Sequence, residues 1–88
     1  EIKNGCLILT KQEYEDRAFK NRKDFKFASA KNLKTVSSNL FWNSSLQFVI
    51  MPEVESIAND AFWKCPLVVI CFLKVKSVGD WAFYGCSQ

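Results

Sequence analysis

Apolar residues recur every 21 positions through most of the chain, and they mark two kinds of short segment in each repeat. In the first kind, residues 54–65 align with residues 75–86 and, one step earlier, with residues 33–44, and every apolar column is kept. In the second kind, residues 46–51 align with residues 67–72. The segments are short, contain many β-branched residues and are separated by turn residues, so they predict strands rather than helices.

A single repeat of this kind cannot bury both of its edges. If repeats stack at the inter-strand distance of ~4.8 Å, their apolar columns join into one continuous core. The chain is therefore predicted to be one array over residues 1–88, a solenoid of stacked parallel β-strands with little helix. Its predicted units are clear at 33–53 and 54–74, partial at 75–88 and degenerate at 11–32.

The degenerate unit is one residue out of phase with the others. Phe19 aligns with Phe62 at a separation of 43 residues, which is 22 plus 21. If the same shift continues into the following strand, Phe27 lies opposite Val49. Residues 5–9 look like the Gly-Cys ending of a unit followed by its strand, with too few residues before Phe19 for a whole unit.

The repeated segments carry a recognisable motif. Residues 78–86, Val-Gly-Asp-Trp-Ala-Phe-Tyr-Gly-Cys, resemble the signature of the BspA-like leucine-rich repeats: isoleucine or valine, then Gly-x-x-Ala-Phe-x-x-Cys, then Leu-x-x-Ile-x-Ile-Pro. Residues 57–65 differ from it only by an alanine for glycine, and Pro52 is kept at the end of one unit. The 21-residue period lies within the ~20–29 residues of leucine-rich repeats. The resemblance is specific over residues 33–86 and loose over residues 10–32.

The resemblance implies a right-handed solenoid with parallel strands. Such repeats occur in surface and secreted proteins of bacteria and protists, where adhesion and protein binding are the usual roles. We therefore expect a non-catalytic binding scaffold at the cell surface or secreted, with a host or cell-surface protein as its partner. The alternative is a structural spacer within a larger surface protein. Because no capping segment precedes the end at Gln88, we also expect contacts with neighbouring repeats of a longer parent chain.

Two adjacent columns contain most of the aromatic residues. The first is predicted to be an interior spine rather than a binding stripe, and it consists of Phe19, Phe41, Phe62 and Phe83. The residue after each phenylalanine is expected to point outward or to lie at a turn, and these residues are Lys20, Trp42, Trp63 and Tyr84. The three aromatics of this second column are a candidate site for proteins or sugar rings. The alternative is that they stack on one another and stiffen the solenoid.

The strand at residues 46–51 offers a second candidate surface. If Val49 points inward, Phe48 and Ile50 point outward, because side chains alternate along a strand. Val69 occupies the same face in the next unit. Exposed apolar patches often mark interaction sites, so Phe48, Ile50 and Val69 are candidate binding residues. The alternative is that a neighbouring segment covers them.

The chain has four cysteines and no histidine. None of the cysteines forms a Cys-x-x-Cys pair, which disfavours zinc and thioredoxin-type sites. Cys65 and Cys86 share a column, and because parallel side chains in a ladder do not face each other, we predict free, buried thiols rather than a bridge. Histidine is the usual general base and metal ligand. No catalytic residue, metal site or cofactor is therefore predicted.

Charge and hydropathy do not alter the prediction of a non-catalytic repeat scaffold. Residues 1–34 hold nine basic and five acidic residues, a net charge of +4, whereas residues 35–88 hold three and four, a net charge of −1. The basic side chains between residues 20 and 26 are interpreted as a solvated face, because no recognised nucleic-acid-binding module accompanies them. The longest apolar run, residues 66–73, is too short to cross a bilayer. Neither a nucleic-acid partner nor membrane insertion is expected.

Overall fold

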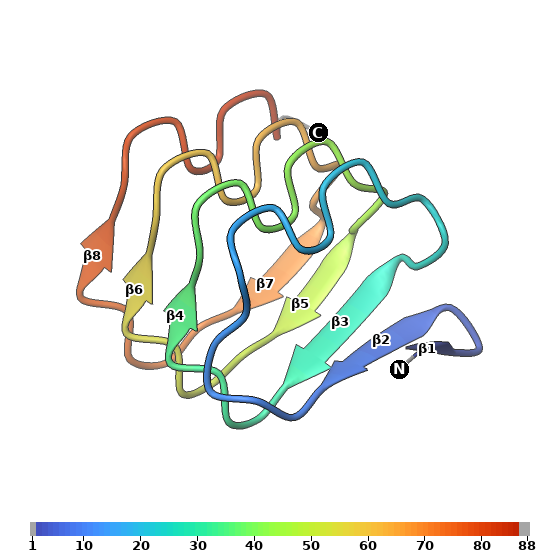
Figure 1. The fold of residues 1–88 in the computed structure, drawn as a ribbon, viewed down its shortest axis with the longest axis horizontal. Helices are drawn as coiled ribbons and strands as arrows, with labels where there is room; N and C mark the ends of the chain where they lie inside the picture. The colour runs from blue at the N-terminus through green and yellow to red at the C-terminus, as the bar shows by residue number, and fades with distance from the viewer. Residues whose placement is uncertain (1, 87–88) are drawn as a thin grey trace.

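The computed structural model describes residues 2–86, which form two sheets on two sides of a coiled chain (Figure 1). The large sheet contains, in spatial order, β1 (Ile2–Lys3), β2 (Cys6–Leu9), β3 (Phe27–Ala30), β5 (Phe48–Ile50) and β7 (Val69–Cys71). The small sheet contains β4 (Thr35–Val36), β6 (Ser56–Ile57) and β8 (Ser77–Val78). The described residues contain no helix, and the predicted solenoid of stacked parallel strands is confirmed.

Every parallel pairing has a register of 21 residues. In the large sheet Phe27 pairs with Phe48, which in turn pairs with Val69. In the small sheet Ser56 pairs with Thr35 on one side and with Ser77 on the other. Each turn of the solenoid therefore places every strand residue next to the equivalent position of the neighbouring turn, so that inward side chains pack on inward side chains.

The core contains the predicted phenylalanine spine. The rings of Phe19 and Phe41 are stacked with centroids 5.5 Å apart, Phe41 and Phe62 are 5.4 Å apart, and Phe62 and Phe83 are 5.3 Å apart. The two central rings are fully buried, and the two end rings are partly buried. Stacked aromatic pairs contribute about 0.5–1.5 kcal/mol beyond the area they bury, so this column ties consecutive turns together.

Two backbone positions in every turn have positive φ. The first column consists of Arg17, Asn39, Asp60 and Trp81, and the second of Asn21, Asn43, Lys64 and Gly85. This conformation costs roughly 1–2 kcal/mol for most L-residues and is easiest for glycine and asparagine. In the second column the Asn43 amide also donates to Asn21 Oδ1 at 3.0 Å, which links two turns through their side chains. Gly85, which precedes Cys86 in the repeat motif, is therefore favoured because glycine adopts a positive φ at little cost.

The expected register of the degenerate unit is partly wrong. Phe19 stacks on Phe41, as the separation of 22 requires, but Phe27 pairs with Phe48 and not with Val49. The extra residue lies between Arg22 and Phe25, where the Arg22 guanidinium holds Asp24 through two hydrogen bonds of 2.9 and 2.6 Å. Beyond this corner the register of 21 returns, so that the small side chain of Ala28, opposite Val49, is the one that is buried.

The expectation for the first residues also needs correction. Asn4 and Gly5, with φ of 55° and 78°, join β1 to β2 as an antiparallel hairpin. Asn-Gly is favoured in such two-residue turns because both positions need positive φ. Cys6 is the first residue of β2 and pairs with Phe27. It therefore does not belong to the column of Cys65 and Cys86, and the Gly-Cys pair is not the ending of a unit.

Candidate functional site

The outward face of the large sheet carries an apolar surface, which we call the strand face. Val49 and Met51 are fully buried, and Phe48 and Ile50 point outward as predicted. Ile50 is 43% exposed and Val69 is 52% exposed. The surface comprises two columns set by the strand register, Cys6, Phe27, Phe48 and Val69 in one and Ile8, Ser29, Ile50 and Cys71 in the other. The three predicted strand residues are therefore neighbours on one face.

The small sheet presents a different outward surface. Its outward column consists of Thr35, Ser56 and Ser77, which lie in register on adjacent strands. The Ser56 hydroxyl donates to Thr35 Oγ1 at 3.3 Å. A polar column of small hydroxyl side chains remains well hydrated. The two sides of the solenoid therefore differ, because one is apolar and aromatic and the other is polar.

The column after the phenylalanine spine forms an aromatic ladder of Trp42, Trp63 and Tyr84. The two indole rings are nearly parallel, with centroids 4.4 Å apart, and Tyr84 stacks on Trp63 at 6.0 Å. The ammonium of Lys20 lies 4.8 Å from the Trp42 ring centroid, within the range of a cation–π contact. A sugar ring would need an open aromatic face, but the faces of Trp42 and Trp63 are occupied by neighbouring side chains. These two tryptophans therefore offer mainly ring edges to a partner, whereas Tyr84 is 49% exposed.

Trp81 extends the aromatic ladder, although the repeat pattern does not predict its contact with Tyr84. Its ring meets Tyr84 edge to face at 5.1 Å, and the residue is 63% exposed. Trp81 belongs to the first positive-φ column, whose other members are Arg17, Asn39 and Asp60. Because that column is polar elsewhere, periodicity alone gave no reason to connect Trp81 with Tyr84.

The thiols of Cys65 and Cys86, which share one column, form hydrogen bonds with backbone carbonyl groups. The Cys65 thiol donates to Phe41 O at 2.9 Å, and the Cys86 thiol donates to Phe62 O at 2.8 Å. Each therefore reaches a phenylalanine carbonyl of the preceding turn. The four cysteines are free, as predicted for Cys65 and Cys86; Cys65 is buried, whereas Cys86 is partly buried. Burial raises the pKa of Cys65 to about 11, and it also raises the pKa of Cys86.

We expect alkylation to separate the thiols by burial. In the native chain at pH 8, iodoacetamide should modify Cys6 and Cys71 first and Cys65 last, because Cys65 is fully buried and holds its proton up to a pKa of about 11. Peptide mass spectrometry over time measures the order. Equal rates at Cys65 and Cys71 without denaturant would contradict this order of burial.

The raised pKa of Cys65 also links stability to pH. The neutral Cys65 thiol stabilises the fold below its ordinary pKa of 9.0, and this contribution is lost as the pH rises towards about 11.

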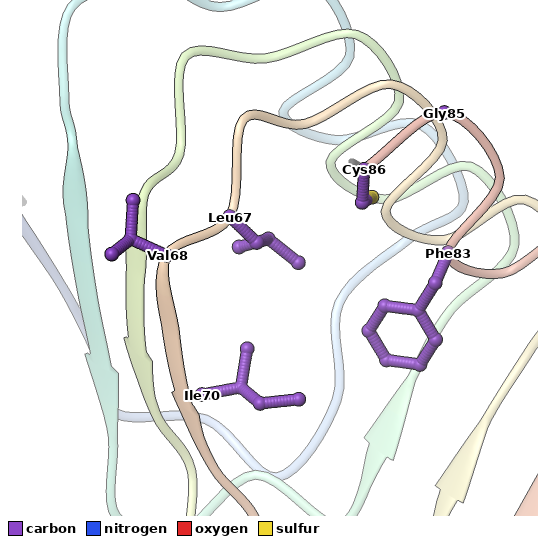
Figure 2. A pocket seen from close by; sticks show the side chains of 6 residues that line it. All are labelled: Leu67, Val68, Ile70, Phe83, Gly85 and Cys86. Carbon is purple, nitrogen blue, oxygen red and sulfur yellow. The ribbon is translucent and has the colours of Figure 1, made fainter. Parts of the chain in front are cut away.

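The last described turn leaves its inward columns uncovered. A groove of about 490 Å³ is lined by Leu67, Val68, Ile70, Phe83, Gly85 and Cys86 (Figure 2). Ile70 is 47% exposed, although its partner Val49 in the preceding turn is fully buried. In the preceding turns the phenylalanine N–H donates to the next turn, from Phe62 to Ala82 O at 2.8 Å for example, whereas no acceptor within residues 2–86 serves the N–H of Phe83. Within residues 2–86, this groove therefore exposes apolar side chains and an N–H group that are covered at the equivalent positions of the preceding turns.

Other kinds of site find little support among the described residues. No group of three or more His, Cys, Asp or Glu side chains within residues 2–86 is arranged to hold a metal ion. The same part of the chain contains no helix that is long and apolar enough to cross a membrane. The salt bridges here are exposed, such as Glu53 with Lys74 at 2.9 Å, so they are expected to stabilise the fold only slightly.

Comparison with known proteins identifies the family. No curated protein and no solved structure matches the chain. A family model described as BspA type leucine rich repeat region (6 copies) matches residues 7–88. The match covers nearly the whole chain and agrees with the repeat motif, the register of 21 residues and the stacked parallel strands. The chain therefore belongs to the BspA-type leucine-rich-repeat family.

Proposed function

We propose that this repeat scaffold binds a partner protein through the strand face, with the edges of the aromatic ladder as a second contact. The observation that carries the proposal is the row of apolar side chains on the outward side of the large sheet. Phe27 and Phe48 lie with ring centroids 6.2 Å apart, and Ile50 and Val69 extend the surface around them. Contiguous exposed apolar surface commonly marks an interaction site, and aromatic residues are enriched in interface cores.

The buried residues beneath the surface support the same proposal. The outward side chains stand on parallel strands whose inward neighbours, such as Val49, are fully buried. A partner that binds such a preformed surface does not need to order it, and this lowers the entropic cost of association. The contrast with the polar Thr35–Ser56–Ser77 column favours the strand face over the opposite side.

The wider role that we propose is adhesion to a host or cell-surface protein, with the chain at the cell surface or secreted. This part of the proposal rests on the family and on no residue of the chain. A structural spacer is the second candidate, and it would need neither the strand face nor the ladder to be accessible. The two candidates differ in one observable respect, because only the adhesion role requires direct contact at Ile50.

A photocrosslinking experiment tests this difference. We expect benzoylphenylalanine at position 50 to capture a specific protein from cell-surface extracts, whereas the same group at position 56, on the polar face, does not. The captured protein is then purified and its affinity measured by calorimetry. Phe48→Ser with Ile50→Ser should weaken binding at least about tenfold, since truncated interface hot spots commonly cost ~2 kcal/mol or more.

The matched control is Thr35→Ala with Ser56→Ala, which alters two outward side chains of the small sheet. It should leave the affinity unchanged, and circular dichroism should show that both double variants are folded. Equal capture at positions 50 and 56, or equal affinities of the two double variants, would favour the spacer.

A further inference from the structure

A second groove lies where the hairpin between β1 and β2 meets the starts of β3 and β5. It has a volume of about 410 Å³, and its lining includes Asn4, Gly5, Lys23, Lys26, Phe27 and Phe48. The backbone holds these segments together, because the N–H groups of Lys26 and Phe27 both donate to Gly5 O, at 3.0 and 3.3 Å. The groove is therefore formed by segments from three separate parts of the sequence.

The floor of the groove is apolar and fixed. Phe27 and Phe48 are half-buried and inclined to each other at 30° on adjacent strands. Phe25, which also lines the groove, is buried and packs edge to face against Phe19 and Phe41 of the spine. A large apolar side chain placed on this floor would contact aromatic carbon without displacing any strand.

The rim of the groove is positively charged. Lys23 and Lys26 are exposed, and neither belongs to any of the ion pairs formed within residues 2–86. The Lys23 ammonium donates to the carbonyl oxygen of Asn43 at 2.7 Å, which leaves its charge uncompensated. Asp24 also lines the groove, but its carboxylate is held by Arg22, and this hydrogen bonding lowers the pKa of Asp24. Two uncompensated ammonium groups therefore flank an aromatic floor.

We propose that this groove binds an acidic peptide segment that carries one large apolar side chain. The apolar side chain packs on Phe27 and Phe48, and neighbouring carboxylates meet Lys23 and Lys26. This inference rests on the proposed function, because it names the chemistry of a partner at one end of the strand face. A nucleic acid fits less well, because backbone recognition relies on a series of phosphate contacts, and the groove presents only two uncompensated cations.

The probe is the blocked pentapeptide Asp-Glu-Phe-Asp-Glu, titrated into the ¹⁵N-labelled chain and followed by NMR. We expect the shift changes to concentrate at the amides of residues 4, 5, 23–27 and 48, and to weaken with added salt. Two comparison peptides separate the contributions: Asp-Glu-Ala-Asp-Glu lacks the ring, and Lys-Lys-Phe-Lys-Lys reverses the charge. Both should bind at least about fivefold more weakly than the probe, because each lacks one of the two contacts, and equal binding of either one would overturn the proposal.

Charge-reversal variants locate the site. Lys26→Glu should weaken binding of the probe about tenfold, whereas Lys31→Glu, which changes the net charge equally at an exposed position outside the groove, should change it less than twofold. Equal effects of the two variants would overturn the proposal, as would displacement of the probe from the same residues by an oligothymidylate of equal charge. If the probe fails but the crosslinked partner still depends on Phe48 and Ile50, only the acidic-peptide assignment falls and the proposed function stands.

Discussion

Phe62→Ala is expected to destabilise the fold by about 3–5 kcal/mol, as large-to-small changes at buried phenylalanines do. Phe62 is fully buried between Phe41 and Phe83, with ring centroids 5.4 and 5.3 Å away. Its loss leaves a cavity between two turns and removes stacking on both sides. In a domain of this size each kcal/mol lowers Tm by roughly 4–8 °C. We therefore expect thermal denaturation followed by circular dichroism to show Tm at least about 12 °C lower.

The conservative control is Phe62→Leu, which keeps most of the apolar volume and removes only the ring. Its cost should be about 1 kcal/mol, near the cost of other swaps that preserve volume. A second comparison is Phe27→Ala on the half-exposed strand face, which should also cost less than Phe62→Ala because less of its surface is buried. A fall in Tm of less than about 5 °C for Phe62→Ala would show that the spine does not dominate the core.

A chain extended after Cys86 by a copy of residues 66–86 is expected to be more stable than the present one by about 2 kcal/mol or more, the gain from burying at least one large apolar side chain. The added turn covers Ile70 and Phe83 and supplies acceptors for N–H groups that lack one within residues 2–86. Solenoid stability is approximately a sum of repeat and neighbour-interface contributions, so one more interface adds to the total. Chemical denaturation should show a higher free energy of unfolding and a larger m-value, because more surface is exposed on unfolding.

The matched control for the extended chain has serine at the inward positions of the added turn, with the same length and turn residues. It should give no gain, because it cannot continue the apolar columns. If the serine version stabilised the chain as much as the apolar copy, chain length rather than stacking would explain the effect. If neither did, the groove next to Phe83 would not be a surface for stacking.

The array could be predicted because the period of the sequence is also the period at which the turns of the solenoid stack. Each apolar column in the sequence corresponds to one line of packed side chains, and Phe41 and Phe62 lie above each other because they are 21 residues apart. The outward direction of the Phe48 and Ile50 side chains could also be predicted, because alternation along a strand is fixed by backbone geometry. These predictions depend only on local geometry and a constant repeat.

The predictions that were wrong concern places where the repeat length is not constant. Phe27 was aligned with Val49 because the shift found at Phe19 was carried through the next corner, whereas the chain corrects it between Arg22 and Phe25. The Gly-Cys pair suggests that Cys6 ends a repeat unit, whereas Cys6 follows a hairpin turn and is the first residue of β2. The groove at Phe27 escaped prediction because its lining comes from residues 4–5, 23–27 and 48, which no single periodic pattern connects.

The corner between Arg22 and Phe25 has a further consequence for how such chains can diversify. It holds one residue more than the corresponding corner of the next turn, yet the spine before it and the strand after it remain in place. Insertion of a single codon at this corner would therefore leave both sheets unchanged. Repeat length can therefore vary at this corner while the stacking on either side is kept, and the corner suits the grafting of a foreign loop.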